Sequence, residues 1–228
     1  MKTSDLEFEV PPSLVADLPL PDRGASRLML VKKDGKIEHL AYRDLPDILG
    51  GELCYLNNSK VRNRSLGRNQ PIYASVEGGL GTPTAGLDIT EELLQSLNHK
   101  FLTLHAGVET FRTIHADNVE EHDIHAAEFY VIPDPPAEPV VAIGTTVVKA
   151  LETFGKTGKP EGESKLFIHP PFTFRRTKAL LTNFHSPRDT HLALTWAFAG
   201  RGRMMDAYAT AVVEKYRFGG FGDAVLFV

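Results

Sequence analysis

Short apolar runs recur along the whole chain, separated by polar, proline-rich or glycine-rich segments. Residues 28–31 and 36–40 flank Asp34-Gly35, a pattern typical of a β-hairpin. Other strands are predicted at 6–10, 52–56, 101–104, 140–143, 166–168, 179–182 and 224–228. Helical periodicity predicts helices at 43–49, 90–97, 190–199 and 203–215, and one from the 144–146 turn to residue 154. Because hairpins cluster in the first half and strands alternate with helices in the second, we expect an α/β (mixed α+β) fold with a mixed sheet.

The most polar strand end follows the apolar run 179–182. Asn183, Phe184 and His185 come directly after it, and Asp189 or Thr190 is placed to cap the next helix. Open α/β sheets bind ligands where a strand's carboxyl end meets a helix amino terminus. The residues therefore predict either a binding site or side chains that tie down a tight turn.

Composition narrows the class of protein. The chain has 228 residues, 42% of them hydrophobic and 24% charged, with a net charge of −4, which argues against a surface coated in positive potential for nucleic acid. A single cysteine, Cys54, excludes an internal disulfide and fits a reducing compartment. No apolar run has the length of a membrane span, and the amino terminus lacks the apolar stretch of a signal peptide. We expect a cytoplasmic protein with no membrane contact.

Residues 60–82 lose the regular pattern and predict a linker or loop. Four basic residues gather at its start, Lys60, Arg62, Arg64 and Arg68. Such a basic cluster attracts phosphates, although a solvated charged loop is the ordinary explanation.

Two further loop ends carry polar groups that packing does not require. His105 stands where the strand 101–104 stops. Gly144, Thr145 and Thr146 open a helix, so their amides predict either a carboxylate or phosphate site or merely a tight turn.

Taken together, nine segments match one family. The chain resembles the S-adenosylmethionine:tRNA ribosyltransferase-isomerases of queuosine biosynthesis, and is identified as a member from motifs such as Leu181-Thr-Asn-Phe-His185. The matching segments are 22–28, 57–61, 83–87, 104–107 with 110–112, 120–125, 144–146, 181–185, 197–200, and 216–218 with 222–224.

The resemblance implies the reaction. The ribosyl part of S-adenosylmethionine is transferred to an aminomethyl-deazaguanine in a tRNA anticodon and rearranged to an epoxycyclopentane, while adenine and methionine leave. S-adenosylmethionine is thus a substrate, and no cofactor is expected. A positioned base could remove the C5′ proton that the sulfonium acidifies. His185 is the first candidate for this base and His105 the second, because histidine suits the task near neutral pH.

The resemblance also suggests binding residues. The methionine carboxylate needs an arginine fork or helix-end amides, for which Arg112, Arg217 and the Gly144–Thr146 turn qualify. The sulfonium suits aromatic faces. The rings that stand in matching motifs are Phe184, Phe198 and Phe218; Asn183 and Asp223 complete the candidate substrate-binding residues.

Several positions depart from the family's pattern. Asp88 replaces a histidine, and it remains a candidate for proton transfer if burial changes its pKa. Lys60 and Lys149 replace arginines and lose the bidentate fork. Glu128 takes the place of a family glutamate only if one residue has been inserted before it. The family's small β-barrel domain is missing between the 57–61 and 83–87 motifs, so we expect residues 1–228 to form a single domain.

Other classes of function stay open. One is an S-adenosylmethionine-dependent lyase or transferase acting on a small molecule, and another is a non-catalytic S-adenosylmethionine-binding relative. A metal site is a further alternative, on the side chains His115, Asp117, Glu120, Glu121, His122 and His125. Because the family resemblance explains His122 and His125 without a metal, no metal is expected. The oligomeric state cannot be inferred from these patterns.

Overall fold

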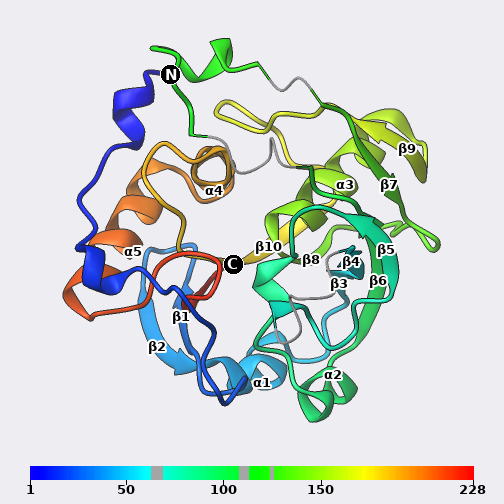
Figure 1. Ribbon diagram of the computed structural model, residues 1–228, viewed down its shortest axis with the longest axis horizontal. Helices are drawn as coiled ribbons and strands as arrows, with labels where there is room; N and C mark the ends of the chain where they lie inside the picture. Colours follow the sequence, from blue (N-terminus) through cyan, green and yellow to red (C-terminus); the bar gives the residue numbers. More distant parts are fainter. Residues whose placement is uncertain (63–68, 108–112, 124–125) are drawn as a thin grey trace.

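The computed structural model describes residues 1–62, 69–107, 113–123 and 126–228. In these ranges nine strands form one mixed sheet, in the order β2-β1-β11-β10-β8-β3-β6-β7-β9 (Figure 1). Its strands are β1 (Arg27–Val31), β2 (Ile37–Ala41), β3 (Cys54–Asn57), β6 (His99–Leu104), β7 (Glu128–Val131), β8 (Val140–Ile143), β9 (Glu161–Ser164), β10 (Thr177–Asn183) and β11 (Ala224–Phe227). A separate parallel pair consists of β4 (Ser59–Val61) and β5 (Val76–Gly79). The helices are α1 (Leu45–Leu49), α2 (Glu91–Ser96), α3 (Thr145–Thr157), α4 (Thr190–Ala199) and α5 (Arg201–Val213).

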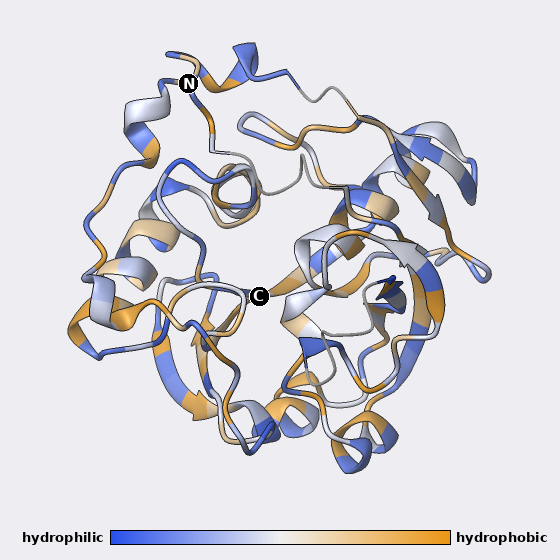
Figure 2. Ribbon diagram, viewed as in Figure 1, coloured by the Kyte–Doolittle hydropathy of each residue, from blue (hydrophilic) through white to orange (hydrophobic). Residues whose placement is uncertain are grey.

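Helices cover both faces of the sheet. Successive strand residues point to opposite faces, and on the central strands both sets are apolar, so each face is buried by helices. On β1, Leu28 and Leu30 pack with residues of α1 and α2, whereas Met29 and Val31 pack with α4 and α5. Leu180 of β10 belongs to a third cluster, with α3. Figure 2 shows the hydrophobic residues along the central strands and the hydrophilic ones on the outer loops and helix surfaces. The central strands β1, β11 and β8 are therefore nearly continuous apolar runs.

Four neighbouring strands end at the same edge of the sheet. Each strand in this group runs parallel to its neighbour in the sheet, in the spatial order β10, β8, β3 and β6. Their carboxyl ends therefore bring Asn183, Gly144, Asn57 and His105 to one edge.

The local signals predicted most elements correctly. The hairpin around Asp34-Gly35 forms β1 and β2, with Gly35 at φ 86° as its turn requires. Thr90 caps α2 by accepting a hydrogen bond from the Leu93 amide at 3.2 Å. Asp189 caps α4 by accepting one from the His191 amide at 2.8 Å.

Two predicted strands are wrong. Residues 6–10 form no strand, because Thr3–Leu6 is a 3-10 helix that buries Leu6 in the core, followed by irregular chain. Residues 166–168 are irregular as well. The strand in that region is β9, whose sequence Glu161-Gly-Glu-Ser164 has no apolar alternation. β7 was not predicted, and the 60–82 segment, expected to be a linker or loop, includes most of β4 and all of β5.

No helix in the described ranges combines the length and the apolar character needed to cross a bilayer.

Candidate functional site

A pocket lies at the edge where the parallel strands end. Four segments that are distant in sequence form most of its wall: 82–85, 144–146, 182–191 and 219–220. We call it the central pocket. Of the predicted site residues, Asn183, His185 and the Gly144–Thr146 turn line it. The structure thus brings the 144–146 and 181–185 motifs together.

His185 is held by groups on both its backbone and its ring. Its amide donates to the Tyr208 hydroxyl at 3.0 Å, and its Nε2 lies 2.8 Å from Thr182 Oγ1. Burial lowers the pKa of His185 to about 3, and the nearby His191 adds to the decrease while Asp189 opposes it. The imidazole is therefore neutral around pH 7, with a proton on one ring nitrogen and a lone pair on the other.

His191 and Asp189 form a hydrogen-bonded pair beside His185. His191 Nδ1 lies 2.7 Å from Asp189 Oδ1, and the two imidazole rings stack at a centroid distance of 5.2 Å. Burial opposes a charge on His191, but the Asp189 carboxylate outweighs it and raises the pKa of His191. The same pairing outweighs burial at the carboxylate and lowers the pKa of Asp189 to about 2. The sequence indicated only a helix cap here; an aspartate at the cap with a histidine two residues later is the signal that could have revealed the pair.

Two buried asparagines connect the strand ends. Asn183 Oδ1 accepts from Thr84 Oγ1 at 2.9 Å, which joins β10 to the 82–85 segment. Asn57 Nδ2 donates to the Leu104 carbonyl and to Thr146 Oγ1, at 2.9 and 3.0 Å. These bonds fix β3, β6 and the start of α3 relative to one another. Thr84 and Asn57 were not among the predicted site residues.

His105 lies beside the central pocket, next to Ala106, which lines it. Its Nδ1 is 2.9 Å from Ser59 Oγ. Burial and the Arg62 guanidinium both lower the pKa of His105. A Cβ at Gly78 would stand 2.6 Å from His105 Nε2, so β5 packs on this ring only because residue 78 has no side chain.

Asp88, Arg217 and Asp223 form a second polar cluster, which does not line the central pocket. Asp223 accepts from the Arg217 amide at 2.8 Å and from the guanidinium at 3.5 Å. Asn183 connects the cluster to the pocket by donating to the Asp223 carbonyl at 3.5 Å. Burial raises the pKa of Asp88 to about 6, opposed by Ser26 and Arg217. Burial thus makes the carboxyl a group that exchanges a proton near neutral pH.

Phe184 requires a correction, because its ring cannot face a ligand. It is 0% exposed and packs against Tyr208, Tyr216 and Phe218 at centroid distances of 5.3 to 5.4 Å. Phe218 is buried in the same cluster, at 1% exposed. These rings support the loop from inside the core and leave no aromatic face for a sulfonium.

Arg112 lies outside the described residues, as do Arg64, Arg68 and His125. Among the described residues, the one group of three side chains able to hold a metal ion is His185, Asp189 and His191, whose ligand atoms lie within 4.8 Å of one another. This group differs from the metal site considered from the sequence, which was placed between residues 115 and 125. In that segment, Glu120 forms an ion pair with the amino terminus at 2.5 Å, and Glu121 accepts a hydrogen bond from Asn118 at 2.8 Å. The expected absence of a metal stays a prediction.

A comparison with known protein families shows to which family this chain belongs. The family model described as "Queuosine biosynthesis protein" matches residues 3–70 and 63–227, which together span nearly the whole chain. The chain belongs to this family. It is 32% identical to the S-adenosylmethionine:tRNA ribosyltransferase-isomerase of a Sulfurihydrogenibium species, with 100% of both chains covered. It is 48% identical to the Thermus thermophilus enzyme of the same name, over 70% of this chain and 51% of that protein.

The fold of this family member is also similar to a solved structure. The crystal structure of the S-adenosylmethionine tRNA ribosyltransferase from Thermotoga maritima matches with a TM-score of 0.74 and 29% identity, covering 99% of this chain and 100% of that chain. These comparisons confirm the family, the mixed α/β fold class and the transferase-isomerase enzyme class that the sequence predicted.

Proposed function

We propose that this protein transfers the ribosyl part of S-adenosylmethionine to a deazaguanine in tRNA, as a ribosyltransferase-isomerase of queuosine biosynthesis. Relatives of that name match 99 to 100% of the chain. The observation that carries the proposal is the convergence of His185, Asn183 and the Gly144–Thr146 turn in one pocket. These groups provide a base, an amide and a helix amino terminus around a space at the sheet edge.

His185 is the base that starts the rearrangement. Its neutral ring removes the C5′ proton, whose acidity comes from the adjacent sulfonium. An imidazole with a pKa of about 3 is a weak base. The transfer nevertheless leaves the net charge of the pocket unchanged, because the negative charge that forms on C5′ balances the adjacent sulfonium as the imidazole gains a proton. For Nδ1 to accept this proton, Nε2–H must donate to Thr182 Oγ1, which lies 2.8 Å away.

The amino terminus of α3 binds the methionine carboxylate. The amides of Thr145 and Thr146 begin α3, where amides have no partner within a helix and carry the positive end of its dipole; the Gly144 amide already donates to the Leu181 carbonyl and the Val147 amide to the Gly144 carbonyl. Gly144 precedes Thr145 with φ 103°, a conformation that favours glycine and turns the chain into α3 at the edge of the pocket.

The tRNA approaches over β4 and β5. Arg62 is exposed at the end of β4 and close enough to His105 to lower its pKa. Lys60 already pairs with Glu77 at 3.5 Å, so Arg62 is the more available cation of the two.

The chain carries out this reaction without the family's small β-barrel. Its alignment with the Sulfurihydrogenibium enzyme extends over 337 positions, while the chain has 228 residues. The two matches to the family model meet at residues 63–70. Both facts support a missing domain within 60–82 and a single remaining domain.

The test is to incubate the protein with S-adenosylmethionine and a tRNA that carries the aminomethyl-deazaguanine. Adenine and methionine should appear in equal amounts, and the tRNA should gain the epoxycyclopentane mass. Adenine release without tRNA would instead indicate a lyase or a transferase with a small acceptor. Binding of S-adenosylmethionine without release under either condition would indicate a non-catalytic relative.

A further inference from the structure

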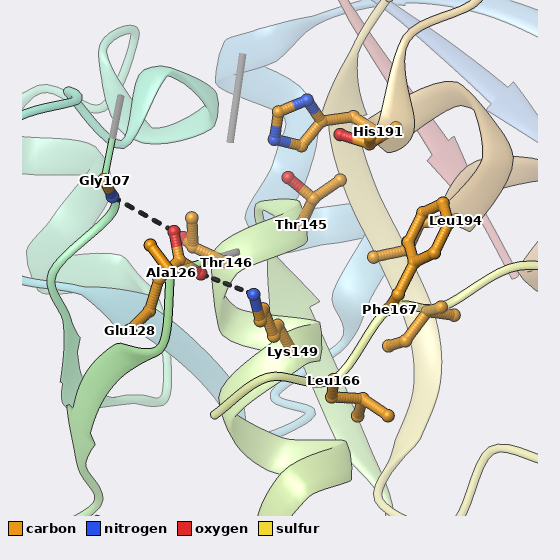
Figure 3. Close-up of a pocket in the computed structure, with 12 residues that line it drawn as sticks. Gly107, Ala126, Glu128, Thr145, Thr146, Lys149, Leu166, Phe167, His191 and Leu194 are labelled. Carbon is orange, nitrogen blue, oxygen red and sulfur yellow. Dashed lines mark hydrogen bonds and ion pairs between the residues drawn. The ribbon is translucent and has the colours of Figure 1, made fainter. Parts of the chain in front are cut away.

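A second pocket adjoins the central one along the first two turns of α3. Its wall includes Glu128 from β7, Thr145 and Lys149 from α3, and an apolar side made by Leu166, Phe167 and Leu194. We call it the side pocket. Figure 3 shows the two charged side chains on one side and the apolar ones across from them. Thr145, Thr146 and His191 line both pockets, so the two spaces meet at the start of α3.

The charged side of this pocket is an ion pair almost removed from solvent. Lys149 Nζ lies 2.7 Å from Glu128 Oε2, and the two side chains are 12% and 4% exposed. The Gly107 amide donates to Glu128 Oε1 at 3.1 Å, which fixes the carboxylate (Figure 3). Removing an ion pair from water costs free energy that its own attraction repays only in part. Both side chains belong to the wall of the side pocket, so this pair borders a cavity and is not enclosed in packed core.

We propose that the side pocket binds the zwitterionic amino acid end of S-adenosylmethionine. The α-ammonium binds Glu128, and the α-carboxylate binds Lys149 together with the first-turn amides of α3. Lys149 follows Thr145 by one helical turn, so both lie on the same face of α3. The methylene groups lie against Leu166, Phe167 and Leu194. This assignment rests on the proposed function for the identity of the whole substrate.

The charges exclude the other parts of the reactants. A phosphate would bring an anion against the Glu128 carboxylate, and like charges at contact repel. Adenine is neutral, so it carries no charged group that either member of the pair could bind. A zwitterion has no net charge and matches the pair group for group.

The connection between the pockets sets the direction of the substrate. With the amino acid end in the side pocket, the sulfonium reaches the shared wall at Thr145 and His191. The ribose then enters the central pocket, where His185 lies stacked on His191. C5′, which is bonded to the sulfur, is thereby directed toward the proposed base.

Calorimetric titration of the full-length protein with S-adenosylhomocysteine and with 5′-methylthioadenosine tests the subsite without any substitution. Both ligands carry adenosine and a neutral sulfur, but only the first carries the amino acid. Charge-assisted hydrogen bonds at two sites predict that S-adenosylhomocysteine binds at least about 30-fold more tightly. Equal dissociation constants for the two ligands would overturn the proposal. Decarboxylated S-adenosylmethionine, compared with S-adenosylmethionine, isolates the carboxylate, and its affinity should be about tenfold lower.

Variants locate the effect. Lys149→Met should weaken S-adenosylhomocysteine at least about tenfold and leave methylthioadenosine within about threefold. Lys156→Met, an exposed lysine on the same helix, should change neither affinity. Because a lone buried charge destabilises the fold, the double variant Lys149→Met/Glu128→Gln serves as a second test. It should bring the two ligands to similar affinity, and an unchanged preference would contradict the assignment.

These outcomes separate the subsite from the reaction. A strong preference for S-adenosylhomocysteine with no adenine release in the presence of tRNA would support the subsite and contradict the proposed ribosyl transfer. Adenine release in the presence of tRNA with no such preference would support the reaction and contradict the subsite. Titration with L-methionine, the amino acid product, tests whether the nucleoside also contributes to binding. L-Methionine should bind more weakly than S-adenosylhomocysteine, since it makes no nucleoside contacts. Equal affinity would contradict a subsite that continues into the central pocket.

Discussion

The imidazoles of His185 and His191 lie face to face in the central pocket, yet their surroundings move their pKa values in opposite directions. Burial dominates at His185, whereas the Asp189 carboxylate dominates the outcome at His191. Two titratable groups with separated pKa values next to each other are typical of acid and base roles. The contrast supports His185, which stays unprotonated around pH 7, as the base in preference to His191.

Replacing His185 with glutamine should remove the base while keeping a polar side chain of similar size. We expect adenine release to fall by about 10²- to 10⁴-fold, the usual contribution of a general base. The dissociation constant for S-adenosylmethionine should stay within about threefold. Single-turnover adenine release and calorimetry measure the two quantities. His99→Gln, at the start of β6 and at the opposite end of that strand from His105, is the matched control. If His185→Gln keeps full activity, the base is a different group.

Asp88 gives a prediction for stability as a function of pH. Its folded pKa is about 6, above its ordinary value of 3.8, so the folded state binds more protons than the unfolded state between these values. The wild type therefore loses stability as the pH rises from 4 to 6. Asp88→Asn has no such loss, so its free energy of unfolding relative to the wild type should increase by on the order of 2–3 kcal/mol between pH 4 and pH 7. Urea denaturation at the two pH values measures this, and a constant difference would mean that burial does not raise the pKa of Asp88.

At the scale of elements, β4 and β5 hold His105 against Ser59. The glycines of β5 make this approach possible: a Cβ at Gly78 would meet the His105 ring, and one at Gly79 would stand 2.6 Å from Ser59 Oγ. β4 and β5 therefore pack against His105 only because residues 78 and 79 are glycines.

Gly78→Ala should push the His105 ring away from Ser59. We expect a loss of about 1–3 kcal/mol in the free energy of unfolding, typical of overpacking, and lower adenine release. Denaturation and the activity assay measure both effects, and the His105 imidazole NMR signals should shift. Gly202→Ala in α5, where an added Cβ meets nothing within 4 Å, is the control and should be neutral or slightly stabilising. An unshifted His105 signal in Gly78→Ala would show that β5 does not hold this ring.

The elements that local chemistry encodes were predictable, and those that depend on pairing were not. Asp34-Gly35, Thr90 and Asp189 each determine a turn or a cap within a few residues. β9 is Glu161-Gly-Glu-Ser164, whose strand conformation comes from pairing with β7 and not from its own side chains. The same limit applies to Phe184. Its place beside Asn183 and His185 in the sequence gave no indication that its ring enters the core.

At the scale of the whole molecule, the site exists because the four parallel strands end together. The family resemblance predicted which loop ends matter, and the strand order explains why Gly144, Asn183 and His185 meet. The Glu128–Lys149 pair was not predictable as a contact, since it depends on how β7 packs against α3, whereas the Asp189–His191 pair lies within three residues and its spacing could have revealed it. Because the net charge of the chain is −4, any attraction to tRNA phosphates must come from local groups of basic residues.

Arg62→Gln should weaken tRNA binding and reduce its salt dependence. Losing one phosphate contact lowers the slope of log K against log salt by roughly 0.7–0.9. Filter binding at several salt concentrations measures the slope. Lys33→Gln, which removes an exposed charge at the β1–β2 hairpin, changes the net charge equally and should leave the slope unchanged. If both variants behave alike, only the overall charge matters.

The position of β11 has a consequence for synthesis. Residues 224–227 are the last strand along the chain but lie inside the sheet, between β1 and β10. On the ribosome, the β1–β2 hairpin and the β8–β10 region emerge before β11, and no other described strand pairs with both β1 and β10. Until then a nascent chain presents two unpaired strand edges, which are prone to association with other chains. The wall at 219–220 is also formed only after these residues have been synthesised, so the central pocket is incomplete in any nascent chain that ends before them.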